Sequence, residues 1–126
     1  MKGGRMEKDK RKKDFIGRFE EKAQELGTSV MVLCEGDLLI SFATPMGDEL
    51  EYTVKADDVT GILEGLQDLY EGFDVDEEAC RRLDREREDG LSPNLRPILE
   101  DAEFTKAFLY HLFDAAQAAM IEMDAH

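Results

Sequence analysis

The chain has 126 residues, of which 42% are hydrophobic and 37% are charged, and its formal net charge is −14. This length predicts one domain with its own core, and the hydrophobic share argues against a long disordered protein. An acidic body repels nucleic acids and anionic membranes, so basic proteins or metal cations are the expected partners.

The charge is divided along the chain. Residues 1–22 contain nine bases and five acids, whereas residues 23–126 contain seven bases and twenty-five acids. No apolar run reaches the length of a membrane span, and the basic start lacks the apolar segment of a signal peptide. Two cysteines, Cys34 and Cys80, are too few for a disulfide framework. A cytoplasmic protein with reduced thiols is therefore expected.

Residues 1–13, MKGGRMEKDKRKK, show no apolar periodicity and predict a flexible basic arm, followed by a single domain over 14–126. The arm is expected to be solvated, or else to contact the acidic face or a phosphate. A first helix is predicted from Asp14, as its N-cap, to Leu26, with Gly27 ending it. Its apolar positions recur at helical spacing: Phe15, Ile16, Phe19, Ala23 and Leu26.

Three strands are predicted at 29–34, 38–43 and 49–55, with turns at 35–37 and 44–48 between them. The first two strands are apolar at successive positions, which predicts burial on both faces. The third alternates, so only one of its faces is expected to be buried. Together they predict a three-stranded antiparallel meander.

Three helices are predicted after the meander. The first is capped by Asp57 or Asp58 and runs to about Glu71, the second covers 76–89 up to Gly90, and the last runs from Ile98 or Asp101 to Met123. Prolines predict a loop or single turn at 91–97. The whole is an α+β domain of order αβββααα.

Three details of these helices bear on function. Gly61 and Gly65 leave backbone open either to a partner or to a packed helix of the same protein. Cys80 is expected to be an apolar filler beside Leu83, and Glu78 is expected to pair with Arg82 on the surface. The last helix has apolar residues over more than half its circumference. It is therefore either a central core helix or a contact between two copies.

Negative charge is densest at residues 48–78, where twelve carboxylates accompany one base, Lys55. Glu64, Asp68 and Glu71 have helical spacing, and strand alternation places Glu49 and Glu51 outward. A rigid row of anions of this kind attracts a protein whose lysines and arginines are spaced for phosphates. The predicted partner-binding residues are Asp48, Glu49, Glu51, Asp57, Asp58, Glu64, Asp68, Glu71, Asp74, Asp76, Glu77 and Glu78.

No motif predicts catalysis, a metal or a cofactor. A calcium loop beginning at Asp74 requires Gly and Glu where the chain has Ala79 and Arg85. The zinc-ligand types are far apart in sequence, at Cys34, Cys80, His111 and His126. No spacing pairs a nucleophile with a base, and no phosphate-binding glycine loop is present. The chain is therefore expected not to be an enzyme.

The order of the first helix, the LLISFATPMGDELEYTV meander and the ADDVTGILEGLQDLYEGFDVDEE helices resembles small acidic inhibitors carried by phages and mobile elements. Over about residues 14–89 it is closest in outline to anti-CRISPR proteins, whereas the arginine-rich helix at 81–87 and the C-terminal helix depart from them. LYEGFDVDEEA and LEDAEFTKAFLYHL are also similar to small acidic bacterial proteins of such elements. The resemblance implies carboxylates that occupy the DNA-reading groove of a CRISPR effector nuclease.

These observations predict an acidic protein that binds and inhibits a basic nucleic-acid-binding protein by mimicking DNA charge, of anti-CRISPR or anti-restriction type. One alternative is a small dimeric chaperone or adaptor joined through its C-terminal helix. Another is a general protein-interaction module, or an acidic surface that serves only solubility.

Overall fold

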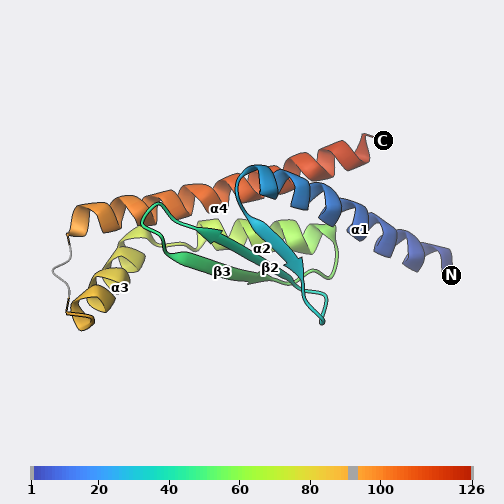
Figure 1. Cartoon of the computed structure of the whole chain (residues 1–126). Coiled ribbons are helices and arrows are strands. Elements are labelled where there is room, and N and C mark those ends of the chain that lie inside the picture. The colour runs from blue at the N-terminus through green and yellow to red at the C-terminus, as the bar shows by residue number, and fades with distance from the viewer. Residues whose placement is uncertain (1, 91–93, 126) are drawn as a thin grey trace.

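A computed structural model describes the backbone of residues 2–90 and 94–125 and the side chains of residues 10–90 and 94–125. The predicted α+β class and element order are confirmed (Figure 1). The elements are α1 (Lys2–Glu25), β1 (Ser29–Val32), β2 (Leu38–Ala43), β3 (Glu49–Val54), α2 (Val59–Glu71), α3 (Val75–Glu88) and α4 (Leu95–Asp124).

The three strands form an antiparallel sheet in the order β1-β2-β3, and Ile40 at its centre lies opposite Val30 and Tyr52. Both predicted turns are confirmed. Gly36 and Gly47 lie in these turns with φ of 94° and 90°, a backbone region that glycine enters without steric cost. The first and third strands end one to two residues earlier than predicted.

Helices cover one face of the sheet, and the other face is open (Figure 1). β3 alternates as predicted, with only its inward positions buried or half-buried. The prediction that the first two strands are buried on both faces is wrong. Met31 and Val32 of β1 are 56% and 54% exposed, and β2 is buried only at alternate positions, Leu38, Ile40 and Phe42. β1 is an edge strand, and apolar composition alone does not distinguish an edge strand from a central one.

α4 is the central helix of the fold, and α1, α2 and α3 all pack against it. It also packs on the sheet, where the Phe108 and Phe42 rings lie 4.3 Å apart. The apolar surplus predicted for this helix is therefore largely used inside the chain, although Phe104 stays 37% exposed. The residues that suggested a dimer through the last helix are mostly part of the core.

α4 begins earlier than predicted, at Leu95, and includes Pro97 in its first turn. Proline is tolerated there because the first backbone N–H groups of a helix have no partner within the helix. The side chain of Asn94 caps this end by accepting a hydrogen bond from the Arg96 N–H at 3.2 Å. Positions 91–93 of the predicted loop lie outside the described residues.

α1 is longer than predicted. Its backbone is helical from Lys2, so the prediction that the helix begins at Asp14 is wrong. Asp14 lies within the helix, where its carboxylate accepts a hydrogen bond from Arg18 at 3.1 Å. Most residues of the basic segment are Lys, Arg, Glu or Met, which favour helix, and a 2.6 Å ion pair from Arg11 to Asp124 ties it to α4. Gly27, with φ of 84°, ends the helix as predicted.

Within the described residues, no helix is long and apolar enough to cross a membrane.

Candidate protein-binding interface

α2 presents a continuous acidic surface. Of the two residues predicted as its N-cap, Asp57 and Asp58, the structure has Asp58 in this position. The Asp58 carboxylate accepts a hydrogen bond from the Gly61 N–H at 2.6 Å. The apolar stripe of the helix, centred on Ile62, is buried against the core. On the opposite side lie three exposed carboxylates, here called the α2 acidic face: Glu64, Asp68 and Glu71.

The α2 acidic face is not neutralised within the described part of the chain. α2 contains no lysine or arginine, and none of the observed ion pairs includes a carboxylate of this face. Only Glu71 has a polar partner, the Gln67 amide that donates to it at 2.9 Å. Four more predicted carboxylates are exposed without an observed ion pair: Glu49, Glu51, Asp57 and Asp76.

The glycines of α2 bring the helix close to the sheet. A Cβ atom on Gly65 would lie 2.6 Å from the Cγ1 atom of Val54 on β3, and on Gly61 it would lie 3.1 Å from the Asp58 carboxylate. For Gly65 neither predicted alternative is right, because its neighbour is a strand of the same chain, whereas Gly61 lies against the cap of its own helix. This close packing fixes the α2 acidic face relative to β3.

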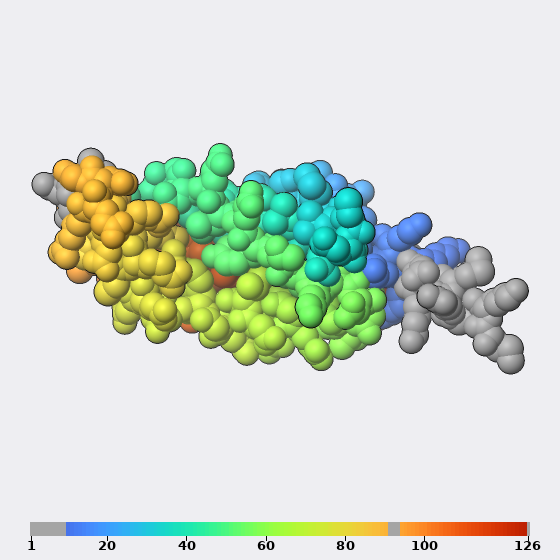
Figure 2. Space-filling view, turned by 90° about the horizontal axis from the view of Figure 1, so that it is seen from below, coloured from blue at the N-terminus to red at the C-terminus, as the bar shows by residue number. Residues whose placement is uncertain are grey.

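The fold divides the predicted row of anions into two groups. Glu49 and Glu51 lie opposite Ala43 and Ser41, on the sheet face that helices leave open. The α2 acidic face points away from the core on the helix side. β3, α2 and α3 are all visible on the side of the molecule that Figure 2 shows, and α2 contacts β3, so the two groups belong to neighbouring elements.

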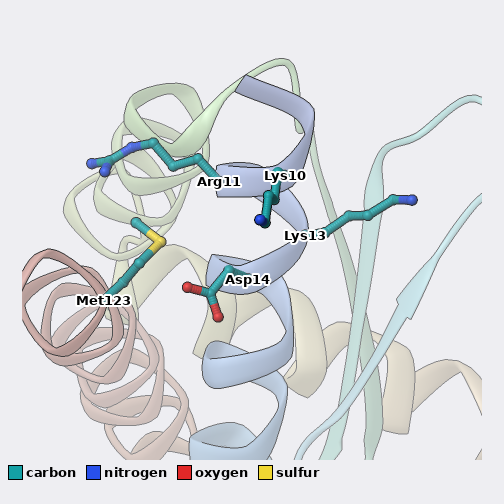
Figure 3. A pocket seen from close by; sticks show the side chains of 5 residues that line it. All are labelled: Lys10, Arg11, Lys13, Asp14 and Met123. Carbon is teal, nitrogen blue, oxygen red and sulfur yellow. The ribbon is translucent and has the colours of Figure 1, made fainter. Parts of the chain in front are cut away.

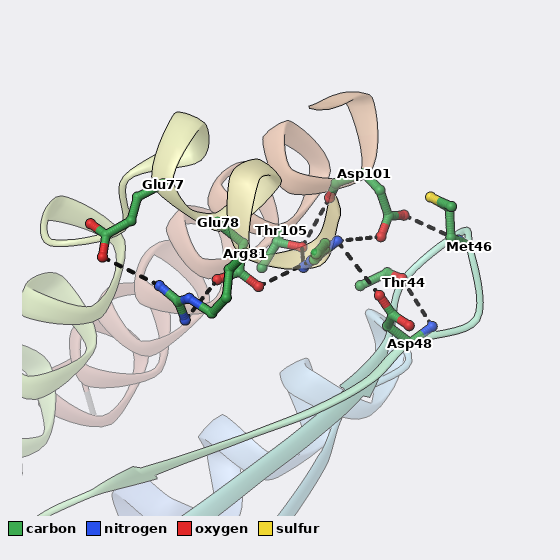
Figure 4. A network of polar contacts seen from close by, with 9 residues as sticks. Thr44, Met46, Asp48, Glu77, Glu78, Arg81, Asp101 and Thr105 are labelled. Atoms are coloured by element: carbon green, nitrogen blue, oxygen red, sulfur yellow. Dashed lines mark hydrogen bonds and ion pairs between the residues drawn. The ribbon is translucent and has the colours of Figure 1, made fainter. Parts of the chain in front are cut away.

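Arg82 forms hydrogen bonds with carboxylates in the interior of the protein, away from the α2 acidic face. Its side chain is only 3% exposed and donates to Glu78 at 3.0 Å, to Asp101 at 2.5 Å and to the Thr105 hydroxyl at 3.2 Å. The second oxygen of Asp101 accepts from the Met46 N–H at 3.1 Å. Arg82 therefore connects α3, α4 and the turn between β2 and β3. Figure 4 shows its partners Glu78, Asp101 and Asp48 around one network of polar contacts.

Three of the predicted partner-binding carboxylates belong to this cluster. Asp48 lies 3.8 Å from Arg82, while Glu77 and Glu78 lie 3.6 Å and 3.1 Å from Arg81. Their charge is already compensated inside the chain. Asp74 has a structural role as well, because it is the N-cap of α3 and accepts from the Glu77 N–H at 3.1 Å.

Sequence reasoning missed the burial of Arg82 and Asp101. The predicted Glu78–Arg82 pair is confirmed, but it lies inside the protein, and the prediction that Cys80 is a buried filler is wrong because Cys80 is exposed. The sequences of α3 and α4 both contain a signal that could have predicted this burial. Arg82 follows Ala79 by three residues, and Asp101 and Thr105 interrupt the apolar stripe of α4 at helical spacing.

Two open hollows lie in this region. One of about 410 Å³ at the α2–α3 junction contains Lys106, whose ammonium group donates to the Phe73 carbonyl at 2.9 Å. Another, of about 460 Å³, lies between β3 and α3.

Burial raises the pKa of the Tyr52 hydroxyl above its ordinary value, and the Glu78 carboxylate raises it further. Among the described residues, no three Asp, Glu, His or Cys side chains gather as metal ligands would.

Function must therefore be inferred from this surface and its charges. Comparisons of the chain with known protein families, with characterised proteins and with solved structures find no match.

Proposed function

We propose that the chain is a non-enzymatic binding protein whose α2 acidic face docks onto a basic nucleic-acid-binding protein and competes with nucleic acid for it. The observation that carries this proposal is that no described lysine or arginine forms an ion pair with this face, while other carboxylates of the chain are paired. Like charges at i, i+4 destabilise a helix by roughly 0.2–0.5 kcal/mol, so Glu64 and Asp68 are not explained by stability.

The spacing of the charges supports a nucleic-acid-binding partner. An α-helix rises about 1.5 Å per residue, so Glu64, Asp68 and Glu71 follow one another at about 6 Å and 4.5 Å along the axis. Along the axis of duplex DNA the phosphates of one strand recur at about 3.4 Å, so the axial spacing of the carboxylates corresponds to one or two phosphates each. Arginines that bind phosphate also form paired hydrogen bonds with carboxylates.

The remaining predicted carboxylates divide into two sets. Asp57, Asp58, Asp74 and Asp76 flank the two ends of α2, and Glu49 with Glu51 extends the negative surface onto the sheet. These form the outer part of the proposed interface. The proposal leaves out Asp48, Glu77 and Glu78, because arginines of the same chain already pair with them. The sequence resemblance suggests a CRISPR effector or restriction nuclease as the class of partner.

In the first step of the test, the purified chain is immobilised and captures proteins from a bacterial lysate. The bound proteins are then eluted with NaCl between about 50 and 500 mM. A purified partner is then titrated with labelled DNA in the presence of the chain. The chain is expected to displace the DNA, with an affinity that falls steeply over about 50–200 mM salt.

Two variants with the same change of net charge sharpen the test. Glu64→Lys/Asp68→Lys/Glu71→Lys is expected to abolish binding. Asp84→Lys/Glu100→Lys/Glu103→Lys reverses three exposed carboxylates outside the interface and is expected to retain it. Equal binding by both variants, or simultaneous binding of chain and DNA to the partner, would contradict the proposal.

A further inference from the structure

The N-terminal part of α1 carries a concentrated positive charge. Residues 10–13 are KRKK, and successive residues of an α-helix are about 100° apart, so these four cations surround the helix. We call them the basic collar. Among the described side chains only Arg11 of the collar has a carboxylate partner, Asp124 at 2.6 Å. Lys10 and Lys13 are exposed at this end of the molecule.

The collar borders a concave surface. Lys10, Arg11 and Lys13 line a hollow of about 680 Å³ with Asp14 and with Met123 from the end of α4. Figure 3 shows Arg11 and Asp14 on either side of Met123, while Lys13 points away from it. The hollow is open, with an apolar floor and a cationic rim, which suits contact with another protein surface.

The collar does not neutralise the α2 acidic face of its own chain. No observed ion pair joins residues 10–13 to α2. α1 is one uninterrupted helix through these positions, so folding the collar back onto Glu64, Asp68 and Glu71 would require breaking the helix. Among the described side chains, Lys10 and Lys13 at one end of the molecule and the carboxylates of the α2 acidic face thus form no observed ion pair.

We infer that the basic collar binds the α2 acidic face of a second copy of this chain. Lys10 and Lys13 are three residues apart, as are Asp68 and Glu71, so both pairs span about 4.5 Å of helix. Two ion pairs can therefore form together when the helices lie side by side. If the collar of each copy binds the α2 acidic face of the other copy, the two contacts together form a closed, symmetric dimer.

This association needs no foreign partner, so it goes beyond the proposed function, but it covers the same face. The net charge of −14 on each copy opposes it. That repulsion is screened beyond a Debye length, about 8 Å at 0.15 M salt, whereas the contacting pairs lie well within this distance. Self-association would therefore compete with a basic partner for α2.

A nucleic acid is a less suitable occupant of the collar. Duplex DNA carries one charge per roughly 1.7 Å along its axis and would extend beyond four cations. The rest of the duplex would then pass residues 23–126, where twenty-five acids outnumber seven bases. A second copy instead offers its acidic face at a spacing that matches the collar.

The test measures the mass of the purified chain by sedimentation at about 50 and 500 mM NaCl. Twice the 14.3 kDa of one chain is expected at low salt, and one chain at high salt. Lys10→Glu/Lys13→Glu and Asp68→Lys/Glu71→Lys should each weaken the dimer by about tenfold or more, as expected for losing four exposed ion pairs, two at each contact of the symmetric dimer. The control Glu100→Lys/Glu103→Lys has the same spacing and should dimerise normally.

Mixing the two reversed variants in equal amounts is expected to restore the dimer, because each then supplies the charge that the other lacks. This rescue also shows that both variants are folded. A wild-type monomer at low salt, or dimers that persist in either reversed variant, would overturn the inference. So would a labelled short DNA duplex that binds the wild type but not Lys10→Glu/Lys13→Glu. Since no foreign protein is present, these results are independent of the proposed function.

Discussion

Arg82 offers the most direct test of how the structure holds together. Replacing it with methionine keeps much of the side-chain volume but removes the charge and the hydrogen bonds to Glu78, Asp101 and Thr105. The Asp101 side chain is 1% exposed, so its carboxylate would stay in the interior with the Met46 N–H as its remaining observed partner. Breaking a buried pair in this way costs about 3–5 kcal/mol of unfolding free energy.

Arg81 is the matched control, because it is the next residue of α3 and also pairs with Glu78. Its side chain is 64% exposed, and such surface pairs contribute about 0–1 kcal/mol. Urea unfolding followed by circular dichroism is suitable, since slopes for small proteins are about 1–3 kcal/mol/M. Arg82→Met should therefore lower the midpoint by about 1–5 M, and Arg81→Met by less than about 1 M.

A second substitution identifies the source of the loss. Arg82→Met/Asp101→Asn removes the uncompensated charge, so it should recover part of the stability lost in Arg82→Met alone. The reasoning would be refuted if Arg82→Met cost no more than Arg81→Met. Equal costs would mean that water reaches the cluster and screens it as it does a surface pair.

Three further predictions follow from single contacts. Gly65→Ala places a Cβ atom 2.6 Å from Val54 Cγ1 and should cost about 1–3 kcal/mol in urea unfolding. Asp58→Ala removes the N-cap of α2 and should cost about 1 kcal/mol by the same measurement. Arg11 lowers the pKa of Asp124 below its ordinary value, so the ion pair is present above that value and is lost as pH falls through the lowered pKa. Carboxyl NMR titration should show this lowered pKa, and Arg11→Gln should return it toward its ordinary value.

Local signals were sufficient to predict much of the fold. Glycine marks the turns and helix ends in which the backbone has a positive φ. Four glycines adopt a positive φ at such positions: Gly27, Gly36, Gly47 and Gly90. α2 was located almost to the residue because its cap and apolar stripe lie within one short segment. The start of α1 was not predicted, since its polar segment lacks apolar periodicity and is tied by an ion pair to Asp124, more than a hundred residues away.

The candidate site was only partly predictable for the same reason. Helical spacing correctly placed Glu64, Asp68 and Glu71 together, because their relation is internal to one helix. Whether a carboxylate is compensated depends on neighbouring elements that spacing does not reveal. Glu78 pairs with Arg82 as spacing suggests, yet Asp101, nineteen residues beyond Arg82, makes that pair part of the interior.

Several carboxylates of the chain support the fold, including two in the outer part of the proposed interface, whereas the α2 acidic face does not. Asp58 and Asp74 begin helices, and Asp101 holds α3 to α4, so changing them alters stability directly. The α2 acidic face has no such role, and its like charges repel one another along the helix. Substitutions there should change binding far more than folding. Because this face forms no ion pair within the described residues, substitutions there test both proposals, docking onto a basic protein and contact with the collar of a second copy, with little effect on the fold.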